Sequence, residues 1–136
     1  MDGKFSEGMT HEITIETTKN HSARKFFPNL PDVFATPYLG GYMERASAEL
    51  IDQQIEEGWQ SVGISMNLQH LAPTPLGMKV KIVTKVTKVE GRKLTFEIEA
   101  FDELEKIGVA THERFIIVAA KFEERVAAKT EKWKNA

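Results

Sequence analysis

The sequence contains no cysteine among its 136 residues. This absence excludes disulfide bonds, thiolate nucleophiles and zinc sites with cysteine ligands. The sequence also lacks any apolar run that approaches the length of a membrane span, and its first residues lack the hydrophobic segment of a signal peptide. We therefore expect a cytoplasmic protein that makes no membrane contact.

An excess of either charge is also missing. The 18 Lys and Arg residues and the 20 Asp and Glu residues leave a formal net charge of −2. Without a basic stripe or a platform of stacking aromatic residues, nothing in the sequence supports nucleic-acid binding. What the chain does have is the length of one domain, residues 1–136, and a hydrophobic content of 41%, which is enough for a substantial core.

The period of the apolar residues predicts one internal helix and several strands. Apolar side chains recur at helical spacing over residues 39–57, and Gly58 then supplies a stop. Long strands that follow one apolar helix pack by wrapping around it. The predicted fold is α+β, a curved antiparallel sheet of about five strands around one long helix, and the tail over residues 123–136 adds a short C-terminal helix. Alternation of apolar and polar residues predicts the strands over residues 11–17, 62–70, 78–89, 92–102 and 107–121.

An irregular stretch, residues 18–37, precedes the predicted helix. Long ordered loops in compact domains often serve as lids or binding loops. The phenylalanines of this stretch, Phe26, Phe27 and Phe34, are equally compatible with a loop that is anchored to the core. At its end, Thr36 and the proline that follows it are typical of a helix N-cap with proline at the first helical position.

Glu44 lies on the apolar stripe of the predicted helix, together with Ala48, Ile51 and Ile55. A carboxylate in that position must be paired, hydrogen-bonded or protonated, because burial of an unpaired charge is costly. Arg45 is not a suitable partner, since adjacent helical residues point in different directions. Glu44 is therefore either a functional group or part of a structural charge network.

His70 ends an alternating run of apolar residues, Val62, Ile64, Met66 and Leu68, which directs its imidazole toward the interior. Such a histidine is either a hydrogen-bonded core residue or a group with a chemical role.

Residues 111–114, Thr-His-Glu-Arg, place four polar side chains within an otherwise apolar strand. Thr111 and Glu113 share one face of that strand, and His112 and Arg114 share the other. Because exposure of both faces is costly for a strand of this composition, we expect one pair to face a ligand cavity or a subunit interface.

Several segments together resemble the fluoroacetyl-CoA thioesterase-like family of hotdog-fold thioesterases. They are residues 33–36 (Val-Phe-Ala-Thr), 41–44 (Gly-Tyr-Met-Glu), 89–94 (Val-Glu-Gly-Arg-Lys-Leu) and 111–114, with the His70 strand and its proline-rich bend. The resemblance covers roughly residues 10–130 and includes the spacing between the key positions. It implies a hotdog fold and hydrolysis of an acyl-CoA thioester to the free acid and coenzyme A. It also implies a homodimer or a dimer of dimers, with no metal and no cofactor beyond the coenzyme A of the substrate.

By the same resemblance, the catalytic threonine, glutamate and histidine of the family fall on Thr36, Glu44 and His70. His70 is then the base, and Glu44 either orients it or activates water itself. Thr36 is either the nucleophile or the group that positions the water. Among the substrate-binding positions, the glycine near the acyl group falls on Gly63 and the pocket arginine falls on Arg114.

The resemblance also bears on the acyl group. The fluoroacetyl-specific enzyme has an aromatic lid residue in the loop before the helix, where this sequence has Leu30. We therefore expect a short- or medium-chain acyl group rather than selectivity for fluoroacetate. The candidates for closing the pocket are Phe26, Phe27, Phe34 and Tyr38, of which Phe34 and Tyr38 are the predicted substrate-binding residues.

Two other functions remain open from the sequence. The first is that of another hotdog enzyme, an enoyl-CoA hydratase or dehydratase. The second is that of a non-catalytic protein that binds acyl-CoA or a small ligand.

One geometric condition constrains the catalytic interpretation. In a continuous helix, Thr36 and Glu44 lie about 12 Å apart along the axis, because each residue rises 1.5 Å. They then cannot share one substrate atom. We therefore expect residues 37–40 to form a loop and the helix to begin near Gly40, with Glu44 in its first turn. If the helix runs unbroken from Pro37, the three residues cannot form one site within a single subunit.

Overall fold

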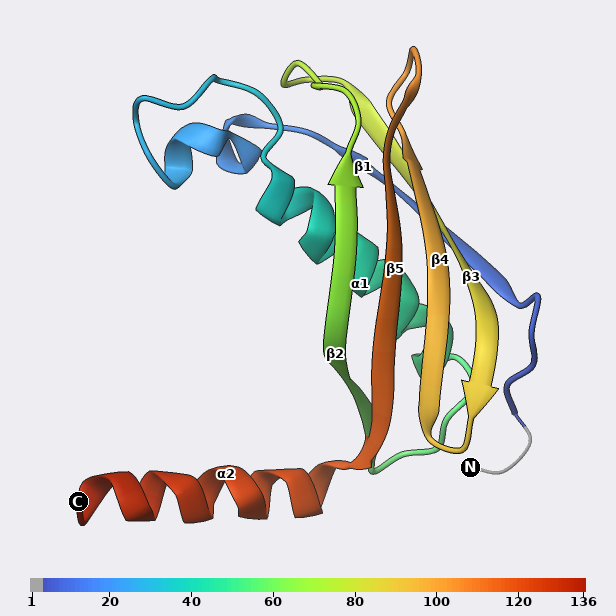
Figure 1. The fold of residues 1–136 in the computed structure, drawn as a ribbon, viewed down its shortest axis with the longest axis vertical. Coiled ribbons are helices and arrows are strands. Elements are labelled where there is room, and N and C mark those ends of the chain that lie inside the picture. Colours follow the sequence, from blue (N-terminus) through green and yellow to red (C-terminus); the bar gives the residue numbers. More distant parts are fainter. Residues whose placement is uncertain (1–3) are drawn as a thin grey trace.

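The protein folds as one curved antiparallel sheet around a long helix (Figure 1). The computed structural model describes residues 4–136. In chain order, the strands and α-helices are β1 (Thr10–Glu16), α1 (Thr36–Asp52), β2 (Trp59–His70), β3 (Lys79–Glu90), β4 (Lys93–Phe101), β5 (Lys106–Val118) and α2 (Ala119–Lys134). The five strands lie in the order β1-β3-β4-β5-β2, and all their pairings are antiparallel. The predicted architecture is confirmed.

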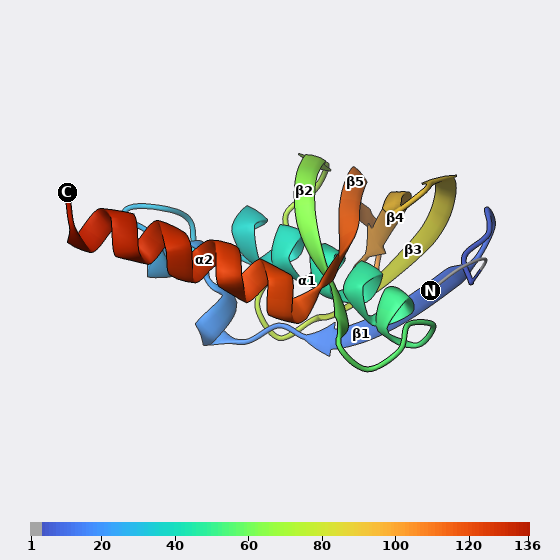
Figure 2. The same ribbon diagram turned by 90° about the horizontal axis from the view of Figure 1, so that it is seen from below.

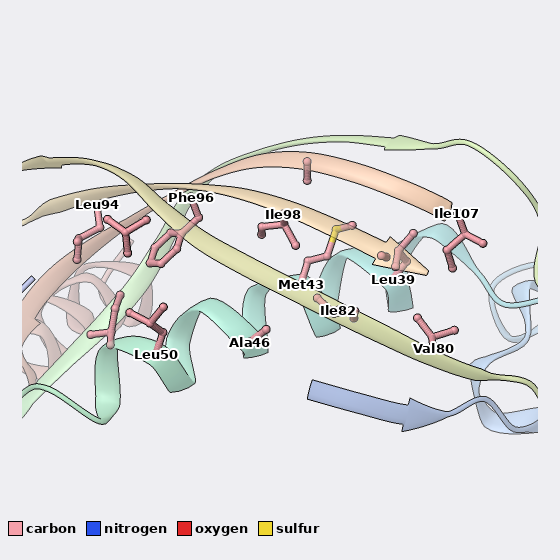
Figure 3. Packing of buried hydrophobic residues seen from close by; sticks show 14 of the residues in the cluster. Leu39, Met43, Ala46, Leu50, Val80, Ile82, Leu94, Phe96, Ile98 and Ile107 are labelled. Carbon is pink, nitrogen blue, oxygen red and sulfur yellow. The ribbon is translucent and has the colours of Figure 1, made fainter. Parts of the chain in front are cut away.

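The core lies between α1 and the face of the sheet that curves around it (Figure 3). Leu39, Met43, Ala46 and Leu50 are buried along one face of α1, as the helical spacing predicts. Every second residue is buried from Val80 to Val86 in β3 and from Leu94 to Ala100 in β4, so the strand period also holds there. Each large apolar side chain buried here stabilises the fold by about 1.5–3 kcal/mol. The sheet side of this core includes Val80, Ile82, Leu94, Phe96, Ile98 and Ile107.

The start of α1 differs from both predictions made for it. The helix runs without a break from Thr36, and Ala35 is the N-cap, so neither the loop over residues 37–40 nor the capping role of Thr36 is present. Pro37 is compatible with the first turn because the first N–H groups of a helix have no partner within it. Glu44 consequently lies in the middle of α1 and not in its first turn.

The end of α1 also comes earlier than predicted, at Asp52 instead of residue 57. Beyond the helix, the chain turns so that Ile55 still packs against the core. Gly58 has a φ of 91° and serves the turn into β2, not the end of the helix. Ile55 thus reaches the core from a loop after the helix. The spacing of apolar residues cannot distinguish this arrangement from one more turn of the helix.

A β-bulge in β2 changes which of its residues face the helix. Gly63 pairs with Arg114 and Ser65 pairs with Glu113, so Ile64 is the extra residue. Because one extra residue reverses the alternation, Gly63 before the bulge and His70 after it share the inner face. The prediction that Ile64 points inward with His70 is wrong, since Ile64 is 50% exposed.

Helix α2 extends away from the sheet and past the edge formed by β2 (Figures 1 and 2). It begins at Ala119, where the sequence predicted a continuing strand. We expected Val126 and Trp133 to make apolar contacts, but their exposed fractions are 52% and 76%. In the part of the chain that the structure describes, no helix is long and apolar enough to cross a membrane.

Candidate active site

Thr36 and His70 form the first half of the predicted site. Thr36 begins α1 and His70 ends β2, and the Thr36 Oγ1 atom lies 2.8 Å from the His70 Nδ1 atom. This is hydrogen-bond distance for a hydroxyl and a neutral imidazole. A hydroxyl that donates to an imidazole nitrogen is the arrangement that general-base catalysis requires.

The environment of His70 favours a neutral base. Burial lowers the pKa of the imidazole below its ordinary value. The Nε2 atom is buried and has no hydrogen-bond partner among residues 4–136. At neutral pH the ring is therefore uncharged, and in the tautomer that carries its proton on Nε2 the Nδ1 atom accepts the proton of Thr36 or of a water molecule.

A cleft of about 320 Å³ opens beside this pair. Phe34 lines it and is only 1% exposed, so one of the predicted substrate-binding residues lies where expected. Tyr38 does not line the cleft and instead packs edge-on against His21. Apart from Thr36 and His70, the lining is apolar and comprises Ala23, Val33, Phe34, Ala35, Leu71, Ala72 and Pro73.

The loop before α1 does not close this cleft through its exposed apolar residues. Phe26 and Phe27 are 58% and 54% exposed, and neither lines the cleft. Leu30 is 39% exposed and its carbonyl accepts a hydrogen bond from Arg24. The prediction that Phe26 and Phe27 close the pocket is not met in this single chain.

Glu44 belongs to a different cluster. Its Oε1 atom accepts a hydrogen bond of 2.9 Å from the Arg114 Nη1 group, which links α1 to β5. The Arg114 side chain is 6% exposed, whereas that of Glu44 is 48% exposed. Glu44 has the hydrogen-bonding partner that we expected, and the partner is the predicted pocket arginine, but the burial on which the expectation rested is wrong because the side chain is half exposed.

Gly63 lies directly against this ion pair. A Cβ atom added at Gly63 would come within 2.6 Å of the Glu44 Oε1 atom and 3.3 Å of the Arg114 Nη1 atom. At the first of these distances the carboxylate, which is the end of a flexible side chain, has to move away. Glycine at this position therefore leaves room for the close approach of Glu44 to the β2 backbone.

For the thioester hydrolysis that the resemblance implies, we predict that Gly63→Ala lowers kcat by about tenfold, because it displaces the carboxylate of Glu44, which the resemblance places in the catalytic site. Steady-state kinetics check this result. Gly41→Ala is the matched control, since nothing lies within 4 Å of a Cβ atom at Gly41. Equal kcat values for both variants would show that the position of the Glu44 carboxylate does not matter.

The structure thus brings the predicted site residues together as two groups. Thr36 and His70 form one group, and Glu44, Gly63 and Arg114 form the other. Because α1 is continuous, Thr36 and Glu44 lie about 12 Å apart along its axis. A triad of Thr36, Glu44 and His70 within one subunit is therefore wrong.

Sequence reasoning left two contributors without a role. Ser61 accepts a hydrogen bond from Arg114 Nε through its hydroxyl, at 2.9 Å, and another from Arg114 Nη2 through its carbonyl, at 3.1 Å. His112 contacts Arg114 Nη1 at 3.2 Å. The sequence predicted that one of the two polar pairs of residues 111–114 faces inward without indicating which, and the structure shows that His112 and Arg114 are the buried pair. Ser61 lies on the same face of β2 as Gly63, but its hydrogen-bond partner could not be predicted without the register between β2 and β5.

Among residues 4–136, no group of three or more His, Asp or Glu side chains is arranged to hold a metal ion.

Comparison with known proteins gives one consistent result. The family described as fluoroacetyl-CoA-specific thioesterase (FlK) matches residues 17–120. A fluoroacetyl-CoA thioesterase from Streptantibioticus cattleyicolor is 33% identical over 133 residues, which cover 93% of this chain and 94% of that protein.

Solved structures agree with the sequence match. The crystal structure of a phenylalanine-to-alanine mutant of the fluoroacetyl-CoA-specific thioesterase FlK has a TM-score of 0.88 and 31% identity, and the match covers 95% of this chain and 99% of that one. A Thermus thermophilus hypothetical protein, described as a thioesterase superfamily member, has a TM-score of 0.92 and 30% identity over the whole of both chains. The chain belongs to the fluoroacetyl-CoA-specific thioesterase family and has its hotdog fold.

Proposed function

We propose that this protein hydrolyses short- or medium-chain acyl-CoA thioesters to the free acid and coenzyme A. The observation that carries the proposal is the contact of 2.8 Å between Thr36 Oγ1 and His70 Nδ1 beside an apolar cleft. The fluoroacetyl-CoA thioesterase from Streptantibioticus cattleyicolor supports the reaction class.

In this proposal, His70 removes a proton during attack on the thioester carbonyl. The proton comes from Thr36 if the hydroxyl is the nucleophile, or from a water molecule that Thr36 positions. In the first route the Thr36 oxygen bonds to the carbonyl carbon, the coenzyme A thiolate leaves as its C–S bond breaks, and the resulting acyl-threonine is then hydrolysed by water. In the second route water attacks the carbonyl directly. Both routes consume one water molecule and give the acid and the thiol.

We further propose that a homodimer completes the site through β2. This strand is an edge of the sheet, is 12 residues long and exposes Ile64, and such an edge is prone to pair with a second chain. Antiparallel pairing about a two-fold axis near residues 66–67 places His70 of one subunit opposite Gly63 of the other. Glu44 of the partner subunit then approaches Thr36 and His70, which the continuous helix prevents within one chain.

In such a dimer, the partner's Glu44 stabilises the positive charge that forms on His70, or it activates the attacking water. Its 48% exposure in the single chain leaves the carboxylate accessible at the β2 edge. Arg114 holds that carboxylate through its hydrogen bond to Oε1, and Gly63 leaves room for the two side chains.

We expect thiol release from a panel of acyl-CoA esters of increasing chain length, with short and medium chains preferred. Because Leu30 does not line the cleft, fluoroacetyl-CoA and acetyl-CoA should be hydrolysed with similar kcat/KM values. The measurement is coupled detection of free thiol. A loss of enoyl absorbance without thiol release would instead identify a hydratase. A rise in melting temperature with acyl-CoA but no turnover would identify a binding protein.

A further inference from the structure

The Arg114 guanidinium is held by more than its ion pair. It lies on the inner face of β5, and its side chain is 6% exposed. Nε and Nη2 donate to the hydroxyl and the carbonyl of Ser61, while Nη1 donates to Glu44. A guanidinium donates in a fixed planar fork, so the two bonds to Ser61 set the plane in which Nη1 meets the carboxylate.

His112 adds a further constraint on the same Nη1 group. The His112 Nδ1 atom lies 2.7 Å from the carbonyl oxygen of Ser65, which can only accept a hydrogen bond. Nδ1 therefore carries the ring proton, and Nε2 is left as an acceptor for Arg114 Nη1 at 3.2 Å. Burial, with a further contribution from the Arg114 charge, lowers the pKa of His112 and keeps the ring in this neutral form.

We propose that His112 and Ser61 are positioning residues for the reaction, which hold Arg114 in the one orientation that fixes the Glu44 carboxylate beside Gly63. The inference rests on the proposed thioesterase function. Arg114 contacts only the Oε1 atom of a half-exposed glutamate, so a rotation of the guanidinium moves the carboxylate directly. Polar groups of two neighbouring strands, β2 and β5, thereby control a carboxylate carried by the helix.

Two substitutions of His112 separate its two contacts. In His112→Asn, the shorter amide keeps a donor for the Ser65 carbonyl and loses the acceptor for Arg114. In His112→Gln, the longer amide places its oxygen near the former Nε2 position and restores that acceptor. We expect kcat to fall by about tenfold in His112→Asn with KM within about twofold of wild type, and the Gln variant to recover most of that loss.

Ser61→Ala provides a test on the other side of the guanidinium. It removes the hydroxyl acceptor for Arg114 Nε and should lower kcat in the same way. Thr111→Val is the matched control. The Thr111 hydroxyl donates to Glu97 on the outer face of the sheet, so its loss should leave kcat unchanged.

An activity-independent measurement accompanies the kinetics. The Arg114 Nε–H resonance in nuclear magnetic resonance spectra should exchange slowly with water in the wild type and in His112→Gln, and faster in His112→Asn and Ser61→Ala. If the wild type releases no thiol from any acyl-CoA, the proposed function fails and this exchange decides the inference. The inference is overturned if His112→Asn and His112→Gln lower kcat equally. It is also overturned if the losses in kcat merely follow the losses in melting temperature, or if no variant changes kcat or the exchange of the Arg114 Nε–H proton.

Discussion

His70→Ala is expected to lower kcat/KM for thiol release by at least about 100-fold, which is the usual contribution of a general base. The reason is local: the imidazole is the only titratable group within hydrogen-bond distance of Thr36 Oγ1 among residues 4–136. Alanine removes the acceptor for the Thr36 proton and leaves the hydroxyl or its bound water without a base. The measurement is steady-state thiol release, with melting temperature recorded for each variant.

His11→Ala is the matched control for that substitution. His11 lies on β1 and also contacts a side chain of α1, the Glu49 carboxylate, at 3.0 Å. Glu49 lies near the other end of α1 from Thr36. The His11→Ala variant should retain wild-type kcat/KM. If His70→Ala is as active as His11→Ala, His70 is a core residue and not a base.

The pH dependence provides a second readout of the same residue. Because burial lowers the pKa of His70, its neutral form persists below the ordinary value of 6.5. Activity should therefore be retained as pH falls to 6.5 and be lost only as pH falls through the lowered pKa, where the imidazole becomes protonated.

Glu44→Gln is expected to lower kcat by more than about tenfold, since an amide cannot stabilise a charged imidazole or accept a proton from water. The amide also leaves the buried Arg114 without its counter-charge, so the melting temperature should fall as well. Kinetics and thermal unfolding of the same preparation measure both effects.

Glu49→Gln offers the corresponding control on the same helix. Glu49 pairs with Arg45 at 2.8 Å and with His11 at 3.0 Å, and the exposed fractions of Glu49, Arg45 and His11 are 36%, 63% and 20%. Exposed pairs of this kind contribute little to stability, so both activity and melting temperature should stay near wild type. Wild-type kcat in Glu44→Gln would remove this residue from the catalytic account.

Much of the architecture follows from local pattern. The spacing of apolar residues identified the helix and the strands because both are amphipathic, with one side in the core. The same reasoning showed that Glu44 needs a partner and that His112 and Arg114 share one face. The shared face follows from the strand period alone, whereas Glu44 has its partner although its side chain is half exposed.

The assembly of the site does not follow from local pattern. The bulge at Ile64 reverses the alternation of β2, and it depends on pairing with β5, so the inward direction of Gly63 was not predictable. Proline at the second helical position is compatible with a loop or with a first turn, which is why the unbroken start of α1 was missed. The division of the site into two groups follows from that one difference.

The most direct test of the account uses mixed subunits. His70→Ala and Glu44→Gln chains, each with a different affinity tag, are co-expressed and the mixed dimers are isolated by both tags. If each site combines His70 of one subunit with Glu44 of the other, a mixed dimer contains one intact site and should show about half the wild-type thiol release per dimer. If mixed dimers stay as inactive as the two parent variants, the site does not form across subunits and the account is wrong.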